Sequence, residues 1–178
     1  GLAVLRAHVG PEFELVALAL DPRFGGVDSD YSAVEAHCRE LGVPLDIRRA
    51  NIGTIVFETR KEHNPCSLCA RMRRAMLHDA AKEYGCNKLA LGHNFEDAAE
   101  TFLMNLFDAG RAECFSPVTY MSRKDITVIR PLIYCREADV LAAAKSLGLP
   151  VMKSPCPADK HTEREHVKEL IARLEAEE

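Results

Sequence analysis

The chain has 178 residues, of which 47% are hydrophobic and 28% are charged, and its formal net charge is −4. This composition predicts one globular domain over residues 1–178, and the negative charge excludes indiscriminate polyanion binding, so any nucleic-acid surface must be local. The sequence has no run of about eighteen apolar residues and no leader of the signal-peptide kind, so we expect a cytoplasmic protein without a membrane anchor.

The first part of the chain alternates predicted helices and strands. Residues 1–9 have helical apolar spacing, and residues 13–20 form a nearly continuous apolar run that ends at Asp21. Such a run is typical of a strand buried on both faces, which places Asp21 at a carboxyl end, where α/β proteins bind ligands. A helix is predicted next at 29–41, and a short strand at 44–48.

The alternation continues to the end of the chain. Apolar spacing and terminating glycines predict helices at 69–84, 95–107, 137–147 and 161–174, strands at 88–91 and 126–129, and a short extended piece at 151–152. Because the strands are apolar, this order predicts an α/β fold, a doubly wound, mostly parallel sheet covered on both faces. The carboxyl ends of such strands form one rim, and we expect it to collect Asp21, Gly92, His93 and Arg130.

Seven cysteines are scattered through the chain. An odd number in a chain of this size favours reduced thiols and a metal site over a disulfide framework. Cys66 and Cys69 lie at the start of a predicted helix with two residues between them. This is the spacing of metal ligands. Four of the seven cysteines are expected to be small buried hydrophobic residues: Cys38, Cys86, Cys114 and Cys135.

A basic segment follows the cysteine pair directly. It contains Arg71, Arg73 and Arg74. We interpret these arginines as contacts to nucleic-acid phosphates, with a solvated helix face as the alternative. Metal or redox chemistry beside nucleic acid is therefore expected here.

The predicted helix at 95–107 begins with acidic residues. Asn94 is suited to be its N-cap, and Glu96 and Asp97 lie in the first turn, where carboxylates complement the helix dipole. His93 precedes them at the end of a strand. We interpret His93 as a nucleotide or magnesium contact; a helix-entry residue without a catalytic duty is the alternative.

Four motifs carry a family resemblance. They are NPCSLC at 64–69, LGHNFED at 91–97, IRPL at 129–132 and SPCPAD at 154–159. In this order they resemble the tRNA 2-thiocytidine synthetase family of PP-loop ATP pyrophosphatases, over nearly the whole chain. The resemblance implies an adenine-nucleotide hydrolase-like fold and an ATP-dependent enzyme that thiolates tRNA.

The resemblance also implies cofactors and site residues. Cys66, Cys69 and Cys156 would hold a 4Fe-4S cluster with one iron left open for sulfide, and ATP with Mg²⁺ would adenylate a pyrimidine C2 oxygen. The catalytic residues would be Asp97 and Arg130, and the nucleotide-binding residues Asp21, Gly92 and His93. The RNA-binding residues would be Arg71, Arg73 and Arg74. The partners would be tRNA and a sulfur donor such as a cysteine desulfurase system, with a homodimer left open.

The sequence departs from the family at two places. The family's phosphate-binding loop, Ser-Gly-Gly-x-Asp-Ser, should lie directly before Gly1 and is not in this sequence. We expect that the native protein has this loop and its strand, because a parallel sheet without its central strand would expose two edges; a homologue without ATP chemistry is the alternative. Glu96 stands where the family usually has aspartate, and it keeps the charge.

Two functions of other classes stay open. One is an iron–sulfur desulfidase that removes sulfur from thiolated bases, which needs the same three cysteines but no ATP loop. The other is a non-catalytic RNA-binding module stabilised by zinc, with His161 joining Cys66, Cys69 and Cys156 in a tetrahedral site.

Overall fold

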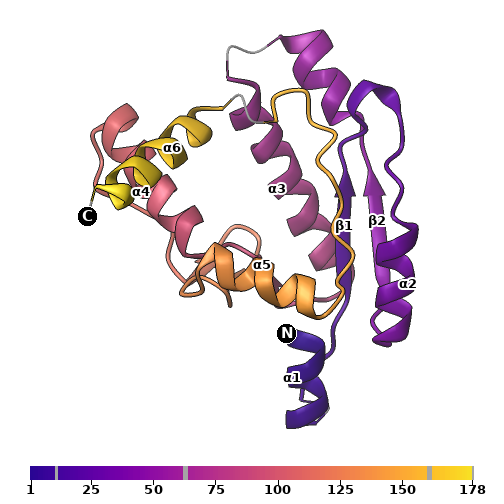
Figure 1. The fold of residues 1–178 in the computed structure, drawn as a ribbon. Helices are drawn as coiled ribbons and strands as arrows, with labels where there is room; N and C mark the ends of the chain where they lie inside the picture. The colour runs from indigo at the N-terminus through magenta and orange to yellow at the C-terminus, as the bar shows by residue number, and fades with distance from the viewer. Residues whose placement is uncertain (11, 62–63, 160–161, 178) are drawn as a thin grey trace. The chain divides into compact units, whose positions relative to one another are not determined.

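The structure is a computed structural model that describes every residue except 11, 62–63, 160–161 and 178. The chain forms two compact units (Figure 1), and each is described by itself. Unit 1 comprises Gly1–Gly85 and Leu149–Pro157, and unit 2 comprises Cys86–Gly148 and Ala158–Glu178. The single domain over 1–178 stays a prediction.

Unit 1 contains a pair of parallel strands with helices around them. Its elements are α1 (Leu2–Val9), β1 (Ala17–Asp21), the 3-10 turn Phe24–Gly26, α2 (Ser32–Glu40), β2 (Leu45–Arg49), a π-helical stretch Thr54–Arg60 and α3 (Pro65–Glu83). In the register of the strands, Ala17 lies opposite Leu45 and Asp21 lies opposite Arg49. Both strands and all three helices correspond to predicted elements, whereas no element is predicted for Thr54–Arg60.

The core of unit 1 fixes α3 against β1, and Figure 1 shows these two elements side by side. The buried residues of this core are Leu20, Ile52 and Val56. Among the residues of α3 that pack against it are Leu68, Met72 and Met76. Because they recur every fourth residue, they form one helical face. The helix that carries the cysteine pair is thereby held beside the carboxyl end of β1.

Unit 2 contains a three-stranded sheet in the order β3-β5-β4. Its elements are β3 (Lys88–Ala90), α4 (Phe95–Ala109), β4 (Val118–Met121), β5 (Ile126–Ile129), α5 (Glu137–Ser146) and α6 (Glu163–Ala176). β5 pairs with β3 in parallel and with β4 in antiparallel orientation. The predicted α/β class and the parallel pairing are confirmed, and the strand expected at 126–129 has the bounds that were predicted.

One strand of unit 2 was not predicted. β4 is not predicted from the sequence, because Val118 and Tyr120 are exposed while Thr119 and Met121 are half-buried, which is the alternating pattern of an edge strand. Residues 151–152, predicted as a short extended piece, lie in coil. Among the described residues, no helix is both long enough and apolar enough to span a membrane.

Candidate functional site

The cysteine pair lies on the first turn of α3. Pro65 occupies the first helical position, and the side chain of Asn64 accepts a hydrogen bond from the Ser67 N–H at 3.1 Å. Asparagine suits the N-cap, and proline suits the first position because its φ is already helical and it lacks the N–H. The helix therefore begins at Pro65 rather than at residue 69. Cys66 and Cys69, three positions apart on it, share one face.

The third predicted ligand lies close enough to influence both of these thiols. Burial raises the pKa of the Cys66 thiol, and Cys156 raises it further. The pKa of the Cys69 thiol is also raised, by burial first; Arg73 opposes this shift, and Cys156 and Cys66 add to it. All three cysteines belong to unit 1 and are free thiols. The structure thus gathers the three cysteines that the motifs single out.

The thiols do not form a closed set of ligands. In the part of the chain that the structure describes, no three His, Cys, Asp or Glu side chains are arranged to hold a metal ion. Cys156 comes from an irregular segment, where its N–H is 3.3 Å from the Ser154 hydroxyl oxygen. His161, the fourth ligand of the zinc alternative, lies outside the described residues. Three neighbouring thiols are the donors that an iron–sulfur cluster needs.

The three arginines after Cys69 are all exposed. Arg73 is four positions after Cys69 and influences its thiol, so it lies on the thiol-bearing face of α3. The same guanidinium acts on Tyr31, whose pKa is raised by burial and by Asp21 and lowered by Arg73 and Arg49. Arg73 is therefore close enough to influence both the Cys69 thiol and the Tyr31 hydroxyl.

Asp21 ends β1 as predicted, and its side chain is 0% exposed. Its carboxylate accepts hydrogen bonds from the Arg23 N–H at 3.0 Å, the Ser29 N–H at 2.7 Å and the Ser29 hydroxyl at 3.1 Å. Burial is the largest influence and by itself would raise the pKa of Asp21, but these hydrogen bonds outweigh it and the pKa is lowered. The carboxylate therefore holds the loop at 21–29, and a nucleotide contact stays a prediction.

Three of the four residues predicted for the rim, Gly92, His93 and Arg130, belong to unit 2, whereas Asp21 belongs to unit 1. β3 and β5 are parallel neighbours, and just beyond β3 the Leu91 N–H donates to the Ile129 carbonyl at 2.9 Å. Gly92 and His93 follow one strand and Arg130 follows the other, so the topology places these predicted residues at the same edge.

Phe115 joins two of these residues and is not predicted from the sequence. The ring centroids of His93 and Phe115 are 4.9 Å apart, and the Arg130 guanidinium carbon lies 4.7 Å from the Phe115 centroid. Phe115 comes from the coil between α4 and β4, and no motif surrounds it. A lone aromatic residue in the polar stretch after Gly110 is the one signal that the sequence offers.

Asp97 lies in the first turn of α4 and exchanges hydrogen bonds with Asn94. Its carboxylate accepts a hydrogen bond from the Asn94 N–H at 3.0 Å, and the Asn94 side chain accepts one from the Asp97 N–H at 2.9 Å. This reciprocal pair is a capping box, and it confirms Asn94 as the N-cap. The other Asp97 oxygen is 3.4 Å from Nη1 of Arg164 on α6.

The amino-terminal ends of α4, α5 and α6 border a hollow of about 170 Å³. Its lining residues are mostly charged: Asn94, Glu96, Asp97, Glu100, Glu137, Arg164, Glu165 and Lys168. Glu96 accepts a hydrogen bond from the Glu137 N–H at 2.7 Å, which joins α4 to α5. Because the amino-terminal end of a helix attracts carboxylates, the acidic lining has a structural cause besides any role in metal binding.

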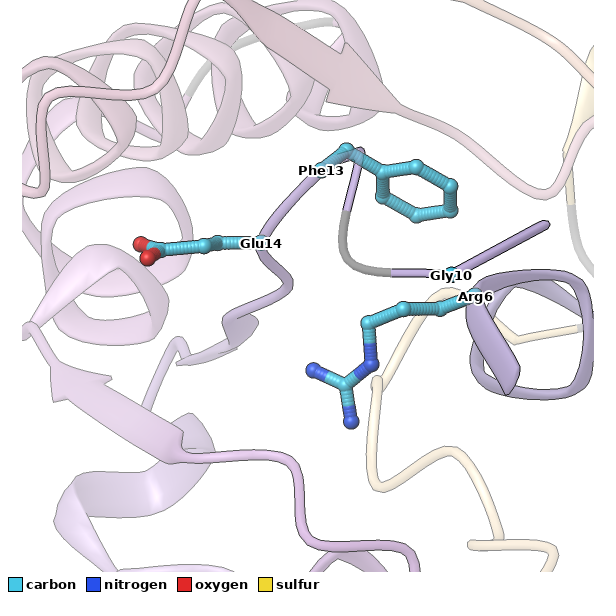
Figure 2. A pocket seen from close by; sticks show the side chains of 4 residues that line it. All are labelled: Arg6, Gly10, Phe13 and Glu14. Carbon is cyan, nitrogen blue, oxygen red and sulfur yellow. The ribbon is translucent and has the colours of Figure 1, made fainter.

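A second hollow lies in unit 1, lined by Arg6, Gly10, Phe13 and Glu14 (Figure 2). The Arg6 guanidinium and the Glu14 carboxylate point in different directions. Arg6 is 3.4 Å from the Gly42 carbonyl oxygen, so this side chain has a structural contact. The hollow contains none of the predicted site residues.

A protein-family model and two similar proteins each match most of this chain. The PP-loop domain family model ATP_bind_3 matches residues 12–174. The chain is 39% identical to a tRNA-cytidine(32) 2-sulfurtransferase of Syntrophotalea carbinolica, with 96% of this chain and 66% of that protein covered. It is 35% identical to a protein of the same name from Citrifermentans bemidjiense, with 98% and 69% covered. The chain thus spans about two thirds of the length of these relatives.

A solved structure also matches. It is the U34-tRNA thiolase NcsA from Methanococcus maripaludis with its [4Fe-4S] cluster, with a TM-score of 0.77 and 26% sequence identity. The match covers 99% of this chain and 61% of that chain.

Proposed function

This chain belongs to the PP-loop family, among the tRNA-cytidine(32) 2-sulfurtransferases, and from that membership we propose that it is the thiolating part of such an enzyme. The reaction is the ATP-dependent replacement of the C2 oxygen of a tRNA cytidine by sulfur. AMP is transferred to that oxygen with release of pyrophosphate, and the oxygen leaves with AMP when sulfide takes its place. The proximity of Cys156 to the Cys66 and Cys69 thiols on the first turn of α3 is the observation that carries the proposal.

These three cysteines would hold a 4Fe-4S cluster, the kind of cluster that the NcsA thiolase carries. When bound, the cluster supplies the sulfur for the substitution. Cys66 and Cys69 contribute a preorganised pair, because α3 is fixed against the core of unit 1. Cys156 comes from the irregular segment that follows α5 in the sequence. No observation on the described residues favours the desulfidase or the zinc module.

The nucleotide would lie at the carboxyl ends of the strands. In unit 2, Gly92 and His93 would contact ATP, and Arg130 would stabilise negative charge on the phosphates or on departing AMP. Asp97 would act through Mg²⁺ with the oxygen that faces Arg164, since the capping box uses the other one. In unit 1, Asp21 is proposed as a further nucleotide contact through the loop that it holds.

The substrate would be a single-stranded tRNA loop, because a base must leave its stack before its C2 position can be reached. Arg71, Arg73 and Arg74 would contact its phosphates. A sulfur donor such as a cysteine desulfurase system would renew the sulfide. A cytoplasmic location is proposed from the tRNA substrate, and a homodimer stays a prediction.

A thiolation assay tests the proposal. Anaerobically purified full-length protein is mixed with unmodified tRNA, ATP, Mg²⁺ and sulfide, and the digested nucleosides are separated by chromatography with mass detection. We expect 2-thiocytidine that depends on ATP. Asp97→Ala should reduce turnover more than it weakens tRNA binding, whereas Asp108→Ala on the same helix should change neither. Cluster-loaded protein that forms no thionucleoside would refute the activity.

A further inference from the structure

The Phe115 ring contacts two residues that have a role in the proposed function. His93 follows β3 and Arg130 follows β5, and both contact the Phe115 ring, with its centroid 4.9 Å from the imidazole centroid and 4.7 Å from the guanidinium carbon. The imidazole is tilted by 41° to the Phe115 ring. These distances are typical of aromatic pairs and of cation–π contacts. One ring from a coil segment therefore contacts two residues at neighbouring strand ends.

The segment that carries Phe115 is fixed to Arg130 at several further points. The Arg130 N–H donates to the Pro117 carbonyl at 2.9 Å. Nη1 of Arg130 donates to the Ser116 carbonyl at 2.6 Å and lies 3.3 Å from the Thr119 hydroxyl oxygen. The coil thus wraps around the arginine, so the Phe115 ring has a defined place relative to the guanidinium.

We propose that Phe115 is a positioning residue, whose aromatic ring sets the orientations of His93 and Arg130 at the strand ends. The expected effect on catalysis rests on the proposed function, whereas the geometry rests on the distances given above. A guanidinium is attracted to the electron-rich face of the ring, and an imidazole packs against it as a flat partner. An aliphatic side chain of similar size fills the space but offers neither interaction.

Two substitutions distinguish the effect of the aromatic face from the effect of side-chain volume. Phe115→Leu keeps an apolar side chain and removes the ring, whereas Phe115→Tyr keeps the ring. In the cluster-loaded full-length protein, Phe115→Leu should lower kcat for thiolation by about tenfold or more with tRNA affinity unchanged, because small displacements of catalytic groups are costly. Phe115→Tyr should restore kcat to within about twofold of the native enzyme. Phe102→Leu, an exposed residue of α4, is the matched control and should retain native kcat.

A second measurement tests the orientation of the His93 imidazole and does not depend on turnover. Nuclear Overhauser effects between the His93 imidazole protons and the backbone around them report the orientation of the imidazole, so their pattern should change in Phe115→Leu and stay native in Phe115→Tyr and Phe102→Leu. Native kcat in Phe115→Leu, or a native pattern of His93 nuclear Overhauser effects in that variant, would overturn the proposal. If the native protein fails to thiolate tRNA, the proposed function is refuted. The His93 nuclear Overhauser effects then decide the positioning claim alone: a changed pattern in Phe115→Leu with a native pattern in Phe115→Tyr supports it, and a native pattern in Phe115→Leu overturns it.

Discussion

Nη1 of Arg164 lies 2.6 Å from Oε2 of Glu100, and this ion pair joins α6 to α4 within unit 2. Glu100 is 5% exposed, whereas the Arg164 side chain reaches the surface. Nη2 of the same guanidinium donates to the Thr101 hydroxyl at 3.1 Å. The carboxy-terminal helix is therefore fastened to α4 one turn after Asp97.

Arg164→Ala should destabilise the protein, because it leaves the buried Glu100 carboxylate without the cation that pairs with it. We expect the free energy of unfolding to fall by about 1–3 kcal/mol, the usual cost of an unsatisfied buried polar group. Urea unfolding measures the difference. Arg173→Ala, an exposed position of the same helix, is the control and should change the free energy by no more than about 0.5 kcal/mol. Equal stability of both variants would show that the ion pair does not stabilise the fold.

The charge of Glu100 should make stability depend on pH. Burial is the main cause that raises its pKa above the ordinary value of 4.5, and Arg164 only partly opposes it. Because the folded state favours the protonated form, this contribution to stability is complete below the ordinary pKa and is lost as pH rises through the raised value.

Glu100→Gln removes that titration. The free energy of unfolding of the variant should therefore fall less than that of the native protein between about pH 4 and pH 7. Urea unfolding at several pH values measures both slopes. Parallel slopes would mean that Glu100 ionises in the folded state as readily as in the unfolded chain.

Asp21 should show the opposite dependence. Hydrogen bonds from Ser29 and Arg23 lower its pKa against the effect of burial, so its contribution is present above the ordinary value of 3.8 and is lost as pH falls through the lowered value. Asp21→Asn should cost about 1–3 kcal/mol at neutral pH, because an amide cannot accept all three hydrogen bonds, and the difference should shrink in acid.

Asp30→Asn is the control for Asp21. Asp30 lies in the same region, and an asparagine oxygen can still accept the hydrogen bond that Asp30 receives from the Ser32 N–H. Chemical unfolding of both variants at neutral and acid pH makes the comparison. A cost at Asp21 no larger than at Asp30 would contradict the role of this carboxylate in holding the loop.

Local chemistry explains which parts of the fold were predictable. The N-cap at Asn94 and the β-branched strand Ile126–Ile129 depend on neighbours in the sequence, and the structure has both where the sequence places them. The start of α3 is equally local, but the sequence pattern alone places it at residue 69, after the cap at Asn64 and the proline that follows.

The features that were not predicted depend on packing between distant segments. β4 is half-exposed at the edge of its sheet, so it lacks the apolar run that identifies a buried strand. The position of Phe115 is set by packing against residues that follow two other strands. The proximity of Cys156 to Cys66 also needs the fold, and in the sequence only the family resemblance links them.

The arginines after Cys69 should determine how tRNA binding responds to salt. The combined Arg71→Ala, Arg73→Ala and Arg74→Ala variant should bind tRNA more weakly, with a slope against the logarithm of salt concentration that is shallower by roughly 0.7–0.9 for each phosphate that is no longer neutralised. Arg39→Ala, an exposed arginine of α2, provides the control. Filter binding over a range of salt concentrations gives the slopes, and an unchanged slope would return these residues to a solvated helix face.

Metal and sulfide analysis of anaerobically purified protein tests the central claim, that three cysteines hold an iron–sulfur cluster. We expect iron and acid-labile sulfide near four per chain, as a 4Fe-4S cluster requires. Alanine at Cys66, Cys69 or Cys156 should abolish both, whereas Cys38→Ala should retain them. Stoichiometric zinc without iron in the native protein, or full iron content in the Cys156→Ala variant, would contradict the account.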